Sequence, residues 1–268
     1  MTKSITKVEI SKFPVIISKT DKTCILGSCF ANEIGTRMKD SGYDVCLNPF
    51  GTLFNPVSIA NSIARLDSAI PFRPDECEPM GAGAGKICSW WHHTSFARPT
   101  AEEFLENANS SLRKASLAWK ESSKVIITLG TAMVWKLVCS GEVVSNCLKR
   151  PSREFSHEML SVAQISAVLN RIIASHPGKE FIFTVSPIRH MGEGAHLNTI
   201  SKASLQMAVE GTGAAYFPAY EILLDELRDY RWFAEDLVHP TKAAADYIWE
   251  RFNEAILSKS PASRQSSY

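Results

Sequence analysis

Short runs of apolar residues alternate along the chain with longer segments whose apolar positions recur at helical spacing. Runs of about four to eight apolar and β-branched residues between turn residues are typical of buried parallel strands, whereas a period of about 3.6 residues indicates helices. The runs predict strands near residues 23–28, 43–48, 124–130, 180–186 and 214–219. Helices are expected at 32–40, 57–66, 101–120, 161–175, 201–210, 220–232 and 241–257, which is the alternation of an α/β domain.

Two stretches interrupt this alternation. Residues 68–99 are rich in proline and contain the glycine-rich run 81–85, so we expect an irregular insertion, which in a compact domain is usually functional or mobile. Residues 134–138 and 142–144 flank a Ser-Gly turn and predict a hairpin, followed by a loop at 146–155. The organisation predicted is one domain at 1–257 and a polar, Ser-rich, disordered tail at 258–268.

Composition narrows the classes of function. With 268 residues and 45% hydrophobic content, the chain can bury a substantial core. Its formal charge of +1 gives no global field toward nucleic acid or anionic membrane, so neither is expected as a partner. A small substrate is the better expectation, and the sequence leaves the oligomeric state open.

Segment hydropathy and cysteine spacing predict a reduced, cytoplasmic protein. The first residues lack the apolar core of a signal peptide, and no apolar run is long enough to span a bilayer. The cysteines number seven and include no C-x-x-C pair, which favours free thiols over disulfides or a zinc site. We therefore predict no metal and no cofactor.

Ser28 occupies the turn between the first strand and the first helix. In an open parallel sheet this turn lies at the carboxyl edge, where ligands bind and where helix N–H groups can hold negative charge. Two interpretations of Ser28 stay open at this point: a cap of the following helix, or a nucleophile. Cys29 is a second candidate nucleophile, because a helix start lowers the pKa of a thiol.

Asp236 and His239 precede the last helix in a D-x-x-H pattern. A serine hydroxyl needs a histidine to accept its proton, and the histidine needs a carboxylate to fix its tautomer. A loop after the last strand can overhang the edge that carries Ser28. The order Ser…Asp-x-x-His resembles that of the SGNH hydrolases.

The resemblance extends to one branch of that group, the GSCFA family, over about residues 23–252. Residues 27–31 read as the name-giving motif, and further segments similar to that family lie at 48–51, 55–56, 129–131, 146–147, 186–190, 201–203, 216–229 and 236–240. The resemblance implies a flavodoxin-like three-layer α/β/α sandwich whose five parallel strands follow the order 2-1-3-4-5. It also implies hydrolase-type chemistry, without naming a substrate.

Two positions depart from the pattern. A typical SGNH hydrolase has a Gly-x-Asn block whose asparagine donates to the oxyanion, but this chain has Ala132 there. Some substitute is expected, because one lost donor typically costs about 10²–10³ in rate. Leu148 also stands where the resemblance implies a histidine. The replacement donors considered are the N–H groups of Ser28 and Gly51, with side chains of Thr131, Asn48, Asn55 or Asn146.

Three other residues carry candidate binding chemistry. We favour substrate binding for Arg189, since a guanidinium can grip a carboxylate or phosphate, over pairing with Asp236 or the acids of 225–229. For His190 we favour a structural role over that of a second acid or base. Trp91, with Trp90, offers an aromatic wall, and the histidines that follow are expected to be packed or solvent-facing.

The function predicted is a serine esterase or O-deacylase acting on a small acylated substrate, with carbohydrate as one candidate class. Ser28 is the expected nucleophile, His239 the base, and Asp236 the residue that orients it. An acyltransferase with the same triad is an alternative. So is a non-catalytic ligand-binding module that keeps the SGNH shape.

Overall fold

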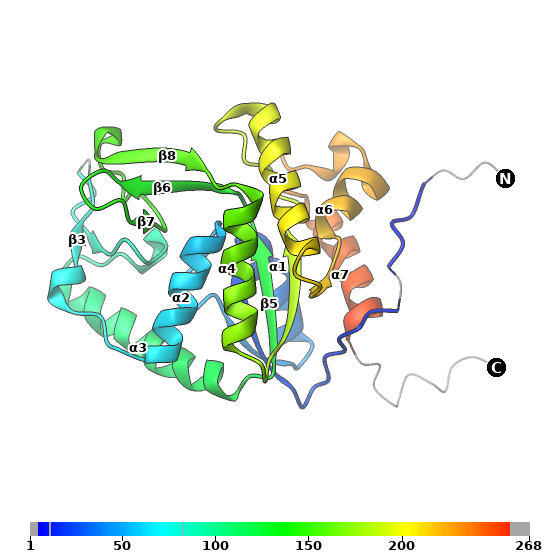
Figure 1. The fold of residues 1–268 in the computed structure, drawn as a ribbon, viewed down its shortest axis with the longest axis horizontal. Helices are drawn as coiled ribbons and strands as arrows, with labels where there is room; N and C mark the ends of the chain where they lie inside the picture. The colour runs from blue at the N-terminus through cyan, green and yellow to red at the C-terminus, as the bar shows by residue number, and fades with distance from the viewer. Residues whose placement is uncertain (1–4, 11, 82, 258–268) are drawn as a thin grey trace.

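A parallel sheet of five strands forms the centre of the computed structural model, which describes residues 5–10, 12–81 and 83–257 (Figure 1). The order β2-β1-β5-β9-β10 is the predicted order 2-1-3-4-5, which is confirmed. Gly27 lies opposite Thr128, so β1 ends one residue before the end of β5. The strands are β1 (Lys22–Gly27), β2 (Asp44–Leu47), β5 (Lys124–Leu129), β9 (Glu180–Val185) and β10 (Ala215–Tyr216).

Helices cover both faces of the sheet because alternate strand residues point to opposite sides. In β5, Val125 and Ile127 join the core under four helices, while Ile126 joins the core on the opposite face. The expected three-layer sandwich is therefore confirmed. The first face carries α2 (Pro56–Ser68), α3 (Ala101–Glu121), α4 (Val162–Ser175) and α5 (Gly194–Glu210), and the second carries α1 (Cys29–Asp40) and α7 (Lys242–Ile256).

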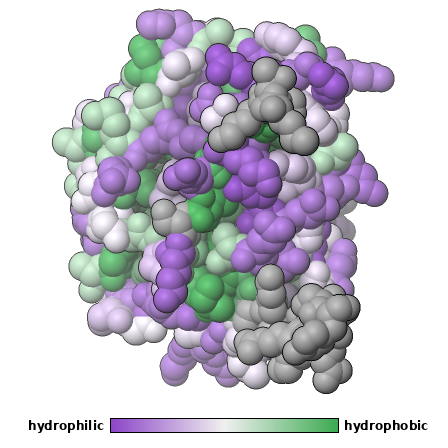
Figure 2. Space-filling view, turned by 90° about the vertical axis from the view of Figure 1, so that its right-hand side faces the viewer, coloured by the Kyte–Doolittle hydropathy of each residue, from purple (hydrophilic) through white to green (hydrophobic). Residues whose placement is uncertain are grey.

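The second face also holds the N-terminal segment against the end of α7. The N–H of Ile17 donates to the carbonyl of Ile256 at 2.8 Å. Figure 2 shows this side of the molecule, where hydrophilic side chains surround smaller apolar areas. The apolar positions of α7, such as Ile248 and Phe252, are buried instead. Among the described residues, no helix is both long and apolar enough to cross a bilayer.

The single helix predicted over 220–232 is wrong. The chain forms a short α6 (Ala219–Glu221), a π-helical turn at Ile222–Leu227 and a 3₁₀ turn at Tyr230–Trp232. Arg228 takes a left-handed φ of 33°, which ends the π-helical turn. Glu226 in this turn is buried and pairs with Arg251 of α7, so a long-range ion pair accompanies the irregular backbone.

The loop predicted at 146–155 leads into a third strand, which begins at Phe155 and which the sequence did not predict. β6 (Met133–Leu137) pairs with β7 (Val143–Val144) and also with β8 (Phe155–Met159). The pairing brings Trp135 over His157, with stacked rings 3.9 Å apart. Contacts of this kind depend on residues far apart in sequence, and local turn residues do not indicate them.

The insertion at 68–99 is irregular, as predicted, with a two-stranded ribbon of β3 (Glu78–Pro79) and β4 (Ile87–Cys88) and 3₁₀ turns at Pro74–Glu76 and Thr94–Phe96. His92 anchors it. This ring is fully buried, contacts the rings of Phe50 and Phe72, and has a pKa lowered to about 3 by burial. The packed role expected for this histidine is confirmed, whereas the predicted tail at 258–268 lies outside the described residues.

Candidate active site

Gly27 turns the chain so that Ser28 can begin α1. Its φ of +137° suits glycine, and a β-carbon at this position would lie 2.1 Å from the carbonyl oxygen of Thr128. The side chain of Asn48 accepts the Gly27 N–H at 2.8 Å, and the N–H of Leu53 donates to the Gly27 carbonyl at 2.8 Å. The loop after β2 thus holds the end of β1 in place.

Replacing Gly27 by Ala is expected to lower the free energy of unfolding by about 3 kcal/mol, because the new β-carbon overlaps the Thr128 carbonyl in a conformation that alanine avoids. Urea unfolding measures the change. Gly178→Ala is the matched control, since its β-carbon would meet nothing within 4 Å. Equal stability of the two variants would contradict the role given to Gly27.

Ser28 is the N-cap of α1 and is fully buried in this structure. Its hydroxyl accepts the N–H of Phe30 at 3.3 Å, and its own N–H donates to the carbonyl of Thr128 at 3.1 Å. Ser28 therefore lies beside the end of β5, at the carboxyl edge that the sequence predicted. The capping interpretation describes its present contacts.

Asp236 and His239 form a preassembled pair in the loop before α7. One carboxylate oxygen of Asp236 lies 2.7 Å from Nδ1 of His239, and the other accepts the N–H groups of Val238 and His239 at 2.9 and 3.0 Å. The bond from the His239 backbone N–H, with the bonds from its ring and from Val238, lowers the pKa of Asp236 to about 2. The carboxylate is therefore ionised at neutral pH and fixes the ring by its Nδ1 edge.

Arg189 holds this loop at the sheet edge. Its guanidinium donates to the carbonyl of Leu237 at 3.0 Å, and its backbone N–H donates to the carbonyl of Val238 at 3.1 Å. The guanidinium carbon also lies 5.5 Å from the centre of the Phe233 ring. In this structure Arg189 thus serves the Asp236–His239 loop, through backbone carbonyls that sequence reasoning did not consider.

The structure does not join Ser28 to His239. Among the described residues, the hydrogen bonds of the His239 ring go to Asp236, and the hydroxyl of Ser28 is bonded to Phe30. His190 lies near His239, close enough that His239 contributes to lowering its pKa to about 4, after burial and Lys202. The two halves of the predicted triad share one edge of the sheet without a direct contact.

Each group predicted for the oxyanion hole has a partner already. The Ser28 N–H is bonded to Thr128, the Gly51 N–H donates to the Asn48 carbonyl at 2.8 Å, and the Thr131 N–H donates to the Phe54 carbonyl at 3.0 Å. The Thr131 hydroxyl lies 3.0 Å from the hydroxyl of Ser201. An oxyanion would have to displace one of these bonds or use another donor.

The predicted asparagine ligands also hold loops. Asn48 bonds Gly27 and also Asn32, and Asn55 caps α2 by accepting the N–H of Ser58 at 2.8 Å. Asn146 donates to the carbonyl of His92 and accepts the N–H of Leu148 at 2.7 Å. All three amides are thus engaged in this structure.

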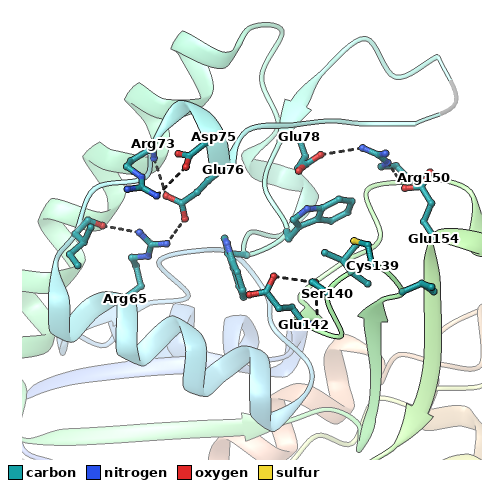
Figure 3. Close-up of a pocket in the computed structure, with 15 residues that line it drawn as sticks. Arg65, Arg73, Asp75, Glu76, Glu78, Cys139, Ser140, Glu142, Arg150 and Glu154 are labelled. Carbon is teal, nitrogen blue, oxygen red and sulfur yellow. Dashed lines mark hydrogen bonds and ion pairs between the residues drawn. The ribbon is translucent and has the colours of Figure 1, made fainter.

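Trp91 lines a pocket formed by the insertion, α2 and the turn between β6 and β7, and Ser28 is not among the residues that line it (Figure 3). The pocket has a volume of about 830 Å³, and its lining residues include Trp90 and Trp91 but none of the predicted triad. Its arginines are neutralised by carboxylates: Arg65 pairs with Glu76, and Arg150 with Glu78 and Glu154. Trp91 is therefore not brought together with the catalytic candidates.

Cys29 is half-buried beside Ser28, and burial raises its pKa. The prediction that the helix start lowers this pKa is therefore wrong, because desolvation outweighs the effect of the helix N-terminus. A thiol that stays protonated is a weak nucleophile. This favours Ser28 over Cys29.

Lys202 is the polar residue of this edge to which sequence reasoning gave no role. It is buried, and its ammonium donates to the carbonyls of Gly130 and Ser186 at 2.6 and 2.8 Å. Burial lowers its pKa to about 7. Its position three residues before buried Leu205 on α5 is the signal that could have placed it inside.

Comparisons with known proteins place the chain in a family. The model of the GSCFA family matches residues 22–252. No curated protein matches the chain. Among solved structures it is similar to the psychrotrophic esterase EstA from Pseudoalteromonas sp., in a structure inhibited by monoethylphosphonate, with 13% identity and a TM-score of 0.43 over 88% of this chain and 96% of that chain.

Proposed function

The chain belongs to the GSCFA family, and from its sheet edge we propose that it is a serine esterase or O-deacylase acting on a small acylated substrate. The observation that carries the proposal is the preassembled Asp236–His239 pair at the edge where Ser28 follows β1. A half-exposed imidazole with an ionised carboxylate on Nδ1 is what a serine nucleophile needs.

In the proposed reaction, the Ser28 hydroxyl attacks the acyl carbonyl and its proton passes to Nε2 of His239. His239 then protonates the departing alcohol, and water attacks the acyl-enzyme with His239 again as base. Because Ser28 is buried and bonded to Phe30 here, the proposal includes a rearrangement of the 234–240 loop or of Ser28 on substrate binding.

Two alternatives to this proposal involve the same edge of the sheet. If an alcohol replaces water at the acyl-enzyme, the same triad performs acyl transfer, with a carbohydrate hydroxyl as one candidate acceptor. A non-catalytic binding module is favoured by a specific observation, the missing Ser28–His239 hydrogen bond. Labelling with a fluorophosphonate probe separates this module from the enzyme.

A fluorophosphonate probe read by intact mass tests the proposal. We expect one adduct on the parent protein, none on Ser28→Ala, and strongly slowed labelling of His239→Ala because its base is gone. Adduct formation that persists in Ser28→Ala and disappears in Cys29→Ala would move the nucleophile to Cys29. A folded parent protein that gives no adduct would favour the binding module.

A further inference from the structure

The proposed reaction needs a hydrogen-bond donor at the oxyanion, and this inference rests on that proposed function. The chain has Ala132 where a typical SGNH hydrolase has its donor asparagine. The N–H groups of Ser28, Gly51 and Thr131 all donate to backbone carbonyls. The oxyanion therefore needs another hydrogen-bond donor at the same edge.

His190 presents such a group. Its Nε2 is buried and is without a hydrogen-bond partner among the described residues. An unpaired polar atom inside a protein costs free energy, so it calls for an explanation such as a ligand contact. The backbone around it is fixed, since the His190 N–H donates to the side chain of Asn198 at 2.8 Å.

The ring lies over the end of the strand beside Ser28. A β-carbon on Gly130 would lie 3.2 Å from His190 Nε2, so glycine leaves room for the imidazole. Gly130 directly follows β5. In the same strand, the carbonyl of Thr128 accepts the N–H of Ser28 at 3.1 Å. Since neighbouring strands lie about 4.8 Å apart, the ring and the serine belong to one small area of the edge.

The surroundings keep the ring neutral. Burial lowers the pKa of His190 to about 4, and the electrostatic influence of Lys202 and of His239 lowers it further. The ring of Phe54 closes another side, with its centre 5.7 Å from that of the imidazole. A neutral imidazole has one N–H, and in the tautomer protonated at Nε2 this N–H is an unpaired donor on the side of the ring that lies against Gly130.

The geometry points to His190 as the oxyanion donor: its Nε2–H hydrogen-bonds the negative oxygen that forms when Ser28 attacks the acyl carbonyl. His190 transfers no proton in this role. It donates the same hydrogen bond to the first and second tetrahedral intermediates, and His239 carries all proton transfer. The ring replaces, from the segment after β9, the asparagine that is missing after β5.

The test compares His190→Asn with His190→Leu, which have similar size and differ in the donor. Phosphonylation of Ser28 by the fluorophosphonate probe is the readout, because its phosphoryl oxygen takes the oxyanion position. We expect the maximal labelling rate of His190→Leu to fall by about 10²–10³, with the half-saturating probe concentration little changed, and that of His190→Asn to fall by about tenfold or less. His196→Leu, on the exposed side of α5, is the control and keeps the parent rate.

Thermal unfolding of each variant separates folding from chemistry. Equal losses in folded His190→Asn and His190→Leu would overturn the donor role, and so would a parent rate in His190→Leu, while the proposed esterase function would stand in both cases. Absence of any Ser28 adduct on the parent protein would instead remove the proposed function, and this inference with it. If His190→Leu does not fold, His190→Gln and His190→Met provide the same contrast between donor and apolar chain.

Discussion

Replacing Asp236 by Asn is expected to lower kcat for hydrolysis of 4-nitrophenyl acetate by about 10⁴. The oxygen of the new amide can still accept the N–H groups of Val238 and His239, so the loop keeps its shape. The amide nitrogen, however, donates toward Nδ1 of His239. This forces the proton onto Nε2, the atom that accepts the proton of Ser28 in the proposed reaction.

Asp225→Asn is the control for this variant, since Asp225 is an exposed carboxylate that lies near Arg228 and outside the site. It is expected to keep the parent kcat. Since the pKa of Asp236 is lowered to about 2, its carboxylate is ionised throughout an assay from pH 5 to 9 and adds no step to the pH profile in that range. A kcat for Asp236→Asn within tenfold of the parent would show that no triad operates.

The sequence predicts the sheet well because the relevant signals are local. β5 is buried along its whole length, and its run of apolar and β-branched residues indicates a central parallel strand before any contact is known. Gly27–Ser28 likewise marks the carboxyl edge of the sheet, because the change from a strand pattern to a helical pattern at these residues is also a local signal. The irregular turns at 219–232 are harder to predict. They contain Glu226, which pairs with Arg251 of α7, and the local periodicity of the sequence does not indicate a contact between residues so far apart.

The candidate site likewise has a part that local sequence patterns predict and a part that depends on contacts between distant residues. The D-x-x-H pattern predicts the Asp236–His239 pair, whose two members are neighbours in the chain. Partners across long sequence distances could not be inferred: Asn146 binds the carbonyl of His92, and Arg189 binds that of Leu237. Every residue carries a backbone carbonyl, so the sequence does not show which carbonyls bind side chains. From the sequence, a polar side chain bonded to a backbone carbonyl therefore cannot be distinguished from one that is free to bind substrate.

The burial of Lys202, which sequence reasoning did not predict, is expected to make the stability of the protein depend on pH. We expect the free energy of unfolding of the parent protein to rise relative to that of Lys202→Met as the pH increases from about 7 toward 10. Burial lowers the pKa of Lys202 in the folded protein from 10.5 to about 7. Between these values the unfolded chain holds the proton that the folded protein has released, so a rising pH favours the folded state.

Urea unfolding at pH 6, 7, 8 and 9 measures the difference between the two proteins. Its slope should approach about 1.4 kcal/mol per pH unit above pH 7 and flatten below pH 7, where Lys202 is protonated in both states. Lys120→Met, at an exposed position of α3, is the control and should give a curve parallel to the parent. A parallel curve for Lys202→Met would mean that the carbonyls of Gly130 and Ser186 keep the ammonium charged, and that His190 faces a full positive charge up to pH 9.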